Sequence, residues 1–108
     1  MEECSIMVAL QDGQSKGVLG ILFEVKGLKF HVRQQGSQWI VSDVILGRNV
    51  ADGWSKGQAI GKTVYMFSQE HVRNAYRWEI NRYESINPDV LSKAQAIECI
   101  EKGEDHEL

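Results

Sequence analysis

The chain has 108 residues, of which 43% are hydrophobic and 25% are charged, and its net charge is −3. This length suits one folded domain with its own core, so we expect residues 1–108 to form a single domain. The composition excludes a disordered chain, and the negative net charge disfavours a broad nucleic-acid-binding surface. No apolar run reaches the length of a membrane span. Two cysteines are too few for a disulfide framework.

Charge is unevenly distributed along the chain. Residues 55–86 carry five basic and three acidic side chains, whereas residues 87–108 carry two basic and six acidic ones. We expect the last five residues, 104–108, to form a frayed acidic tail. Because the chain begins with acidic residues where an export signal would be basic, we predict a cytoplasmic location.

The first half of the chain has the pattern of an antiparallel β-meander over residues 18–46. Three segments rich in branched and aromatic residues are separated by turn residues: 18–26, 28–34 and 38–46. Connections this short cannot make parallel crossovers, so neighbouring strands are expected to be antiparallel. The run Ser5–Leu10 fits a further strand or one helical turn equally well, and residues 47–54 are predicted to be a loop.

A helical part is predicted to follow over residues 55–103. Ser55 and Gln58 have the spacing of a capping box, which indicates a helix start. A strand over residues 63–67 is the competing interpretation, because these side chains also have high β-propensity.

The hydrophobic phase jumps near Ser68, so we place a break there and expect Ser68 to cap a second helix. Val72, Tyr76, Ile80 and Tyr83 would share its buried face. That helix is predicted to end at Asn87, and Asn87 with Pro88 would begin a final helix. The predicted fold is therefore α+β, with an antiparallel sheet of three or four strands and two or three C-terminal helices packed on one sheet face.

No motif carries a recognisable catalytic or metal-binding chemistry. Gly57–Thr63 ends like a phosphate-binding loop, but three residues separate its glycines where the motif needs four. The histidines and cysteines are scattered at spacings that preorganise no metal site. His31, on the polar face of the strand over 28–34, is expected to be solvated. These observations favour a protein that is not an enzyme and that has no cofactor or metal.

The segment Ser68–Ile86 is the leading candidate for a binding surface. Four residues of its predicted helix make up that surface: Arg73, Tyr76, Arg77 and Trp78. Tryptophan, tyrosine and arginine dominate the residues that contribute most to protein–protein binding. The alternative is that Trp78 is buried between the sheet and a neighbouring helix. We predict a small interaction module, an adaptor or an inhibitor of a larger machine, whose partner is another protein; a homodimer is also compatible.

Two other functions stay open. A small-molecule site or minor enzyme could use a pocket between sheet and helices, for which the candidate residues are Trp39, Asp43 and Trp54. A buried Asp43 with a raised pKa would favour that function, whereas an Asp43 that faces water or caps a neighbouring backbone group would not. The third candidate is a single-stranded nucleic-acid binder, which predicts affinity that falls steeply with salt.

Overall fold

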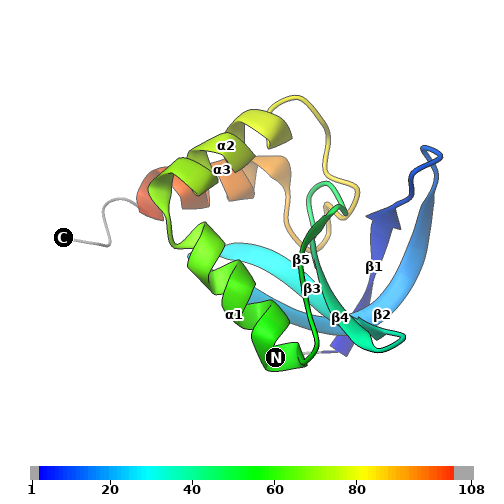
Figure 1. The fold of residues 1–108 in the computed structure, drawn as a ribbon. Helices are drawn as coiled ribbons and strands as arrows, with labels where there is room; N and C mark the ends of the chain where they lie inside the picture. Colours follow the sequence, from blue (N-terminus) through cyan, green and yellow to red (C-terminus); the bar gives the residue numbers. More distant parts are fainter. Residues whose placement is uncertain (1–2, 104–108) are drawn as a thin grey trace.

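The computed structural model describes residues 3–103 and shows an α+β fold in which five antiparallel strands precede three helices (Figure 1). The strands are β1 (Glu3–Ala9), β2 (Ser15–Val25), β3 (Leu28–Gln35), β4 (Gln38–Asp43) and β5 (Asn49–Gly53). The helices are α1 (Lys56–Phe67), α2 (Glu70–Ile80) and α3 (Lys93–Gly103). None of these three helices is long and apolar enough to cross a membrane. The predicted tail, residues 104–108, lies outside the described residues.

The sheet is an open meander in which each strand pairs with its neighbour in sequence, in the order β1-β2-β3-β4-β5. The predicted antiparallel meander is confirmed, and the ambiguous run Ser5–Leu10 lies mostly within the strand β1. The β2–β3 turn places Lys26 and Gly27 at φ values of 52° and 84°. Two consecutive positive φ values characterise the tight turn whose twist matches that of the flanking strands.

β5 corrects the prediction of a loop over residues 47–54. Ala51 pairs with Val41, and Gly53 pairs with Trp39, across an antiparallel ladder. The segment contains turn-forming residues, but strand propensity depends strongly on the neighbouring strand. Pairing with β4 therefore outweighs the local turn signals.

An aromatic chain in the core joins the sheet to α1 and α2. Phe30 of β3 has no solvent exposure, and its ring centre lies 5.7 Å from that of Phe23 and 4.7 Å from that of Phe67. Phe67, at the end of α1, meets Tyr76 of α2 edge to face at 5.4 Å. Tilted and edge-to-face contacts of this kind are the favourable arrangements of aromatic rings.

The predicted start of α1 at Ser55 is confirmed, and Gln58 bonds back to the residue before this cap. Ser55 Oγ accepts the Gln58 N–H at 3.1 Å, and Gln58 Oε1 accepts the Trp54 N–H at 2.7 Å. The helix continues through residues 63–67, so the competing strand interpretation is wrong. Thr63 is buried there, with its hydroxyl donating to the helix backbone. That bond satisfies a polar group that burial would otherwise leave unpaired.

The predicted break between two helices is confirmed, but its cap differs from the prediction. α1 ends at Phe67, and α2 begins at Glu70 with Gln69 as its N-cap. Ser68 belongs to the preceding helix instead, because its hydroxyl donates to the Tyr65 carbonyl oxygen at 2.9 Å. Ser68 therefore closes α1, and Gln69 makes no side-chain cap to α2.

The prediction that Asn87 and Pro88 begin the last helix is wrong. α2 stops at Ile80, and α3 begins only at Lys93. The buried Asn87 side chain bonds to β1 instead: Oδ1 accepts the Met7 N–H at 2.7 Å, and Nδ2 donates to the Met7 carbonyl oxygen at 2.9 Å. The amide thus takes the place of a neighbouring strand at the outer edge of β1, where backbone groups would otherwise lack partners.

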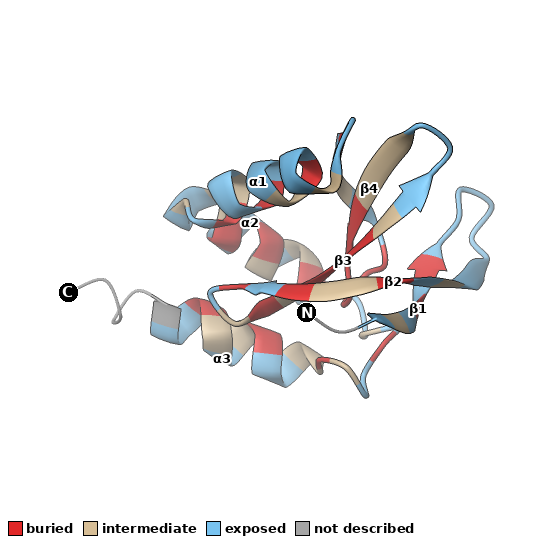
Figure 2. Cartoon of the chain, turned by 90° about the horizontal axis from the view of Figure 1, so that it is seen from below, coloured by how far each residue is buried: buried red, intermediate tan, exposed pale blue. Residues whose placement is uncertain are grey.

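The helices lie on both sides of the sheet, contrary to the prediction that they share one face. α1 packs on the face that carries Phe30, whereas Glu24 and Lys29 point from the opposite face toward α3. Figure 2 shows the β2–β3 hairpin between α1 and α3. α2 contacts both other helices, and this position leaves one of its sides open to solvent.

Candidate functional site

The four predicted binding residues lie on two different sides of α2. Arg73 and Tyr76 are 3% and 8% exposed, whereas Trp78 is 61% exposed and Arg77 lies partly exposed. At 3.6 residues per turn, Tyr76 and Trp78 are about 200° apart around the helix, so one faces the core and the other faces water. The structure therefore does not bring all four residues into one surface.

Arg73 belongs to the interior and connects two helices. Its guanidinium donates to the Phe67 carbonyl oxygen at 3.0 Å. Phe67 is the last residue of α1, where backbone carbonyl groups have no partner within the helix. A cation at this end also interacts favourably with the helix dipole. Arg73 is thus placed to stabilise the α1–α2 junction, and it is not available to a partner.

Tyr76 bonds to Asp43, which is buried at 1% exposure. The Asp43 carboxylate accepts three hydrogen bonds, from the Tyr76 hydroxyl at 2.8 Å, the Leu46 N–H at 2.8 Å and the Arg48 N–H at 3.0 Å. Burial raises the pKa of Asp43, and these three donors oppose the rise. Burial and the adjacent carboxylate raise the pKa of Tyr76, so its hydroxyl stays protonated and continues to donate.

The predicted pocket residues Trp39, Asp43 and Trp54 do not gather around one site. Trp39 is half-buried and pairs with Gly53, so it lies at the same end of the β4–β5 ladder as Trp54, which is 70% exposed. Asp43 lies at the opposite end of β4. It is buried, as the pocket hypothesis requires, but its oxygen atoms are occupied by internal donors. Asp43 therefore matches the alternative interpretation, a cap for its own loop.

Two cation–π pairs lie at the end of α2. The Arg82 guanidinium carbon lies 4.8 Å from the centre of the Trp78 ring, and that of Arg48 lies 5.1 Å from the centre of the Tyr83 ring. We call these four residues the Trp78 surface. Each stack contributes about 0.5–1 kcal/mol at an exposed position. Together they hold two cations beside exposed aromatic carbon.

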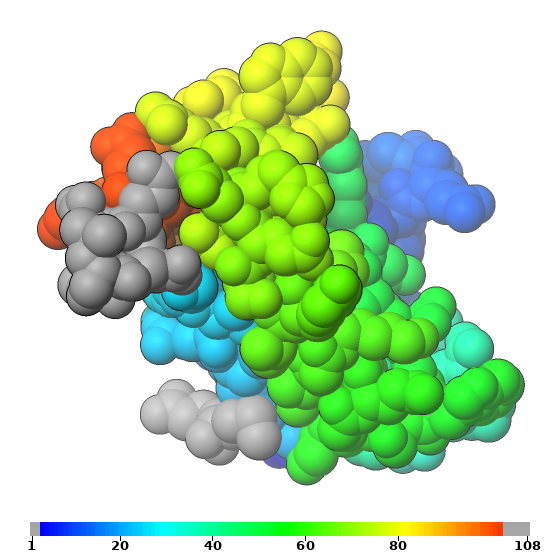
Figure 3. Space-filling view, turned by 60° about the vertical axis from the view of Figure 1, so that its left-hand side comes forward, coloured from blue at the N-terminus to red at the C-terminus, as the bar shows by residue number. Residues whose placement is uncertain are grey.

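Other exposed apolar side chains extend the Trp78 surface toward β1. Ile86 and Met7 are large hydrophobic residues that are 36% and 37% exposed. Ile86 packs against Gly47, where a Cβ would collide with it, and Gly47 directly precedes Arg48. In Figure 3, α2 and the segment that follows it, coloured yellow-green to yellow, form the upper part of the visible face. Ile86 therefore lies next to the connection that carries Arg48.

The sequence pattern predicts Trp78 as a binding residue but not the residues that surround it. The i, i+4 spacing of Trp78 and Arg82 is a usable signal for their contact. Tyr83 was placed in the buried stripe because the helix was predicted to continue to Asn87. Since α2 ends at Ile80, Tyr83 leaves that stripe and becomes exposed. Arg48 comes from the β4–β5 connection, and no local pattern links it to α2.

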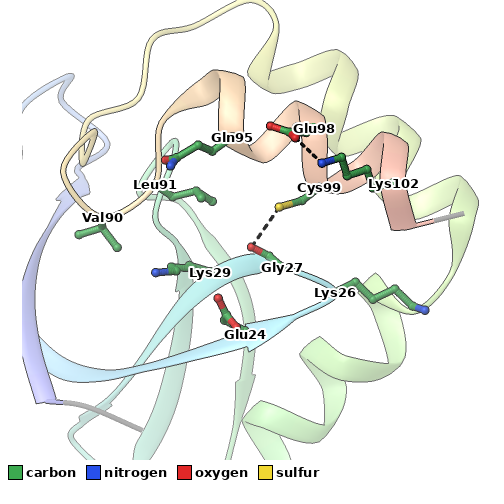
Figure 4. Close-up of a pocket in the computed structure, with 10 residues that line it drawn as sticks. All are labelled: Glu24, Lys26, Gly27, Lys29, Val90, Leu91, Gln95, Glu98, Cys99 and Lys102. Carbon is green, nitrogen blue, oxygen red and sulfur yellow. Dashed lines mark hydrogen bonds and ion pairs between the residues drawn. The ribbon is translucent and has the colours of Figure 1, made fainter. Parts of the chain in front are cut away.

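A separate hollow of about 690 Å³ lies between α3 and the β2–β3 hairpin (Figure 4). It is lined by Glu24, Lys26, Gly27, Lys29, Val90, Leu91, Gln95, Glu98, Cys99 and Lys102. Cys99 points toward the hairpin, and its thiol donates to the Gly27 carbonyl oxygen at 3.6 Å. Burial raises the pKa of Cys99, which disfavours the reactive thiolate. Half of the lining residues are charged, whereas small-molecule sites are mostly apolar.

His31 is buried, contrary to the prediction that it is solvated. Its ring reaches across Gly20, where a Cβ would come within 2.5 Å of it, and Nε2 bonds to the Cys4 carbonyl oxygen at 3.0 Å. Nδ1 has no hydrogen-bond partner among the described residues. Burial lowers the pKa of His31, so the ring is held neutral. Within residues 3–103, no cluster of three or more histidine, cysteine or acidic side chains could hold a metal ion.

Comparison with known proteins adds no family to this geometry. No family model matches the chain, and no curated protein or solved structure resembles it significantly. Because folds host many unrelated functions, the chemistry of the surface is the basis for inferring function.

Proposed function

We propose that this protein is a small non-enzymatic interaction module, an adaptor or an inhibitor of a larger machine, that binds another protein through the Trp78 surface. The observation that carries the proposal is the exposure of Trp78, 61%, although Tyr76 on the same helix fills the core. Exposed apolar patches on a small domain mark interaction sites. Tryptophan, tyrosine and arginine, the residue types of this surface, are also the most frequent binding hot spots.

The surface is held in place before any partner arrives. Arg82 and Arg48 lie over the two exposed rings, at 4.8 Å and 5.1 Å from the ring centres. Side chains that are already ordered lose less conformational entropy on binding. This preorganisation supports a binding role over a merely tolerated exposed tryptophan.

The experiment is an affinity pull-down from lysate of the native host, run with and without nuclease, using wild type, Trp78→Ala and Trp54→Ala. Trp54 is a matched control because it is a 70% exposed tryptophan outside the Trp78 surface. We expect a stoichiometric protein partner with wild type and Trp54→Ala that is lost with Trp78→Ala. A partner that is retained by Trp78→Ala would contradict the proposed surface. Recovery that disappears with nuclease would indicate nucleic-acid binding instead.

Small-molecule binding is the second candidate, and the hollow under α3 is the observation that supports it. Its volume, about 690 Å³, is within the usual range for ligand sites. The test is a metabolite screen by thermal shift, followed by amide chemical-shift mapping of each hit. A true ligand would shift Gly27, Leu91 and Cys99, which line the hollow. Shifts spread over the surface, or no stabilising compound, would exclude this function.

A further inference from the structure

The two arginines of the Trp78 surface indicate which chemical group of a partner this surface can bind. A guanidinium that lies over an aromatic ring keeps its N–H groups in its own plane, at the edges of the stack. Arg82 over Trp78 and Arg48 over Tyr83 therefore hold guanidinium N–H donors beside apolar rings. A planar guanidinium edge matches a carboxylate, which it binds with two parallel hydrogen bonds.

The internal carboxylates do not use these edges fully. Arg77, the third arginine nearby, is bonded to Glu101 at 2.6 Å. Arg48 lies 3.8 Å from Glu79, which is an ion pair beyond hydrogen-bond length. In the part of the chain that the structure describes, Arg82 forms no ion pair with a carboxylate. Arg82 and Arg48 thus keep guanidinium N–H groups available to a partner, whereas Arg77 is already bonded to Glu101.

On the basis of the function proposed above, we propose that the partner presents a short acidic segment with an apolar side chain next to its carboxylates. The apolar side chain packs on the exposed rings of Trp78 and Tyr83. The carboxylates accept hydrogen bonds from Arg82 and Arg48. Arg82 and Arg48 would then determine which segments bind, while Trp78 supplies most of the apolar contact.

Two other occupants fit the surface less well. A nucleic acid would bring a long row of phosphates to a chain with net charge −3, and that row would continue past the two arginines, one of which already lies beside Glu79. A second copy of the chain would place the same patch against itself, as two-fold interfaces do. Glu79, the carboxylate that lies beside Arg48 in each copy, is already paired with that arginine at 3.8 Å. A short acidic segment brings its few carboxylates to the two arginines alone, and these carboxylates are not already paired within the chain.

The test is selection of a displayed random-peptide library on the immobilised full chain, with unselected peptides as the reference. We expect the selected pool to be enriched in Asp and Glu beside Leu, Phe or Trp. Selected peptides are then synthesised with a fluorescent label, and their dissociation constants are measured by anisotropy. We expect Arg82→Gln and Arg48→Gln each to weaken binding roughly tenfold. Arg77→Gln is the matched control, and we expect less than about a twofold change because Glu101 already occupies Arg77.

The outcomes separate this inference from the proposed function. Neutral or basic peptides that lose affinity with Trp78→Ala would contradict the acidic partner but support the interaction surface. The same conclusion follows if acidic peptides lose affinity with Trp78→Ala but bind Arg82→Gln as tightly as wild type. Peptides that bind Trp78→Ala normally overturn both. A pool without enrichment overturns the claim that a short segment suffices. A dimer seen by sedimentation and abolished by Trp78→Ala shows that a second copy covers the surface, which also overturns the acidic partner.

Discussion

The inner and outer sides of α2 each carry a large aromatic residue with a polar group, but one is buried and the other is exposed. Tyr76 is buried, and its hydroxyl donates to a carboxylate that also accepts two backbone N–H groups. Trp78, two positions later in the sequence, is exposed and is covered on one face by a guanidinium with no carboxylate partner among the described residues. On the inner side, all three donors near Asp43 bond to its carboxylate. On the outer side, no carboxylate of the described residues pairs with the guanidinium of Arg82.

This difference separates two energetic roles. A buried polar group without a partner costs free energy of folding, so the interior of α2 has to be saturated. An exposed cation without a partner costs little free energy of folding, because water solvates it. Hydrogen-bond donors without a protein acceptor are therefore tolerated on the exposed side of α2, where they cost little folding free energy and are accessible to a partner. Mutations on the two sides are expected to separate stability from binding.

The largest effect is expected from Asp43→Ala. This change removes the acceptor of Tyr76, Leu46 and Arg48 together, and we expect the free energy of unfolding to fall by about 3–5 kcal/mol. Asp43→Asn is the control, because it keeps one oxygen and nearly the same volume, and its cost should be about 1–3 kcal/mol. The measurement is urea unfolding followed by tryptophan fluorescence. A cost below about 1 kcal/mol for Asp43→Ala would mean that the saturated interior contributes little.

Tyr76→Phe is expected to have the next largest effect, and its size should depend on pH. It removes one hydrogen bond to a carboxylate, so we expect a loss of about 1.5–3 kcal/mol at a pH where Asp43 is ionised. Folding raises the pKa of Asp43 by burial, so its contribution to stability falls as the pH rises from its ordinary value of 3.8 through the raised pKa. The Tyr76 hydroxyl opposes this penalty, because it favours the ionised form.

The variant should therefore differ from wild type most at neutral pH and least when Asp43 is protonated. Unfolding curves of both proteins between about pH 8 and about pH 4 measure this difference. A difference that stays constant over this range would show that the hydroxyl does not sense the charge of Asp43.

The parts of the fold that could be predicted from the sequence are those that local patterns determine. Alternation and turn residues predicted the meander, and the Ser55–Gln58 spacing predicted the start of α1, since cap and partner lie within one turn. β5 was missed because it contains the turn residues Asp52 and Gly53, whose local signal is outweighed by pairing with β4. Asn87 has the local signature of an N-cap, but Met7 uses its amide. The capping bonds of α3 come from Ser92 and Gln95 instead.

The candidate site was predictable to the same extent. The sequence placed Trp78 away from the stripe of Val72, Tyr76 and Ile80, and this angular separation is what exposes it. Arg73 could not be assigned to the interior, because the side-chain hydrogen bond that holds it there is to the end of another helix. Arg48 could not be assigned to the surface, because the fold brings it to Tyr83. Helix periodicity indicates direction, whereas partners across the fold require the structure.

Trp78→Ala tests the outer side directly, and we expect it to cost no more than about 1 kcal/mol of unfolding free energy. The ring is 61% exposed, so truncation removes little buried area and leaves no cavity. Trp54→Ala, at a comparably exposed tryptophan, should behave similarly. Urea unfolding of both variants measures this effect. A loss of several kcal/mol for Trp78→Ala would place the indole in the core and remove the basis of the proposed surface.

The smallest effect on stability is expected from Arg82→Gln. The change removes one exposed cation–π contact, so the free energy of unfolding should fall by no more than about 0.5–1 kcal/mol. Arg77→Gln breaks the ion pair with Glu101 and should cost a similar amount, because exposed ion pairs contribute about 0–1 kcal/mol. Equal costs in urea unfolding would make the two variants a matched pair for binding. If Arg82→Gln then weakens binding while Arg77→Gln does not, the difference lies in the guanidinium that has no internal carboxylate. If both weaken binding equally, general positive charge rather than the stacked donor edge explains the effect.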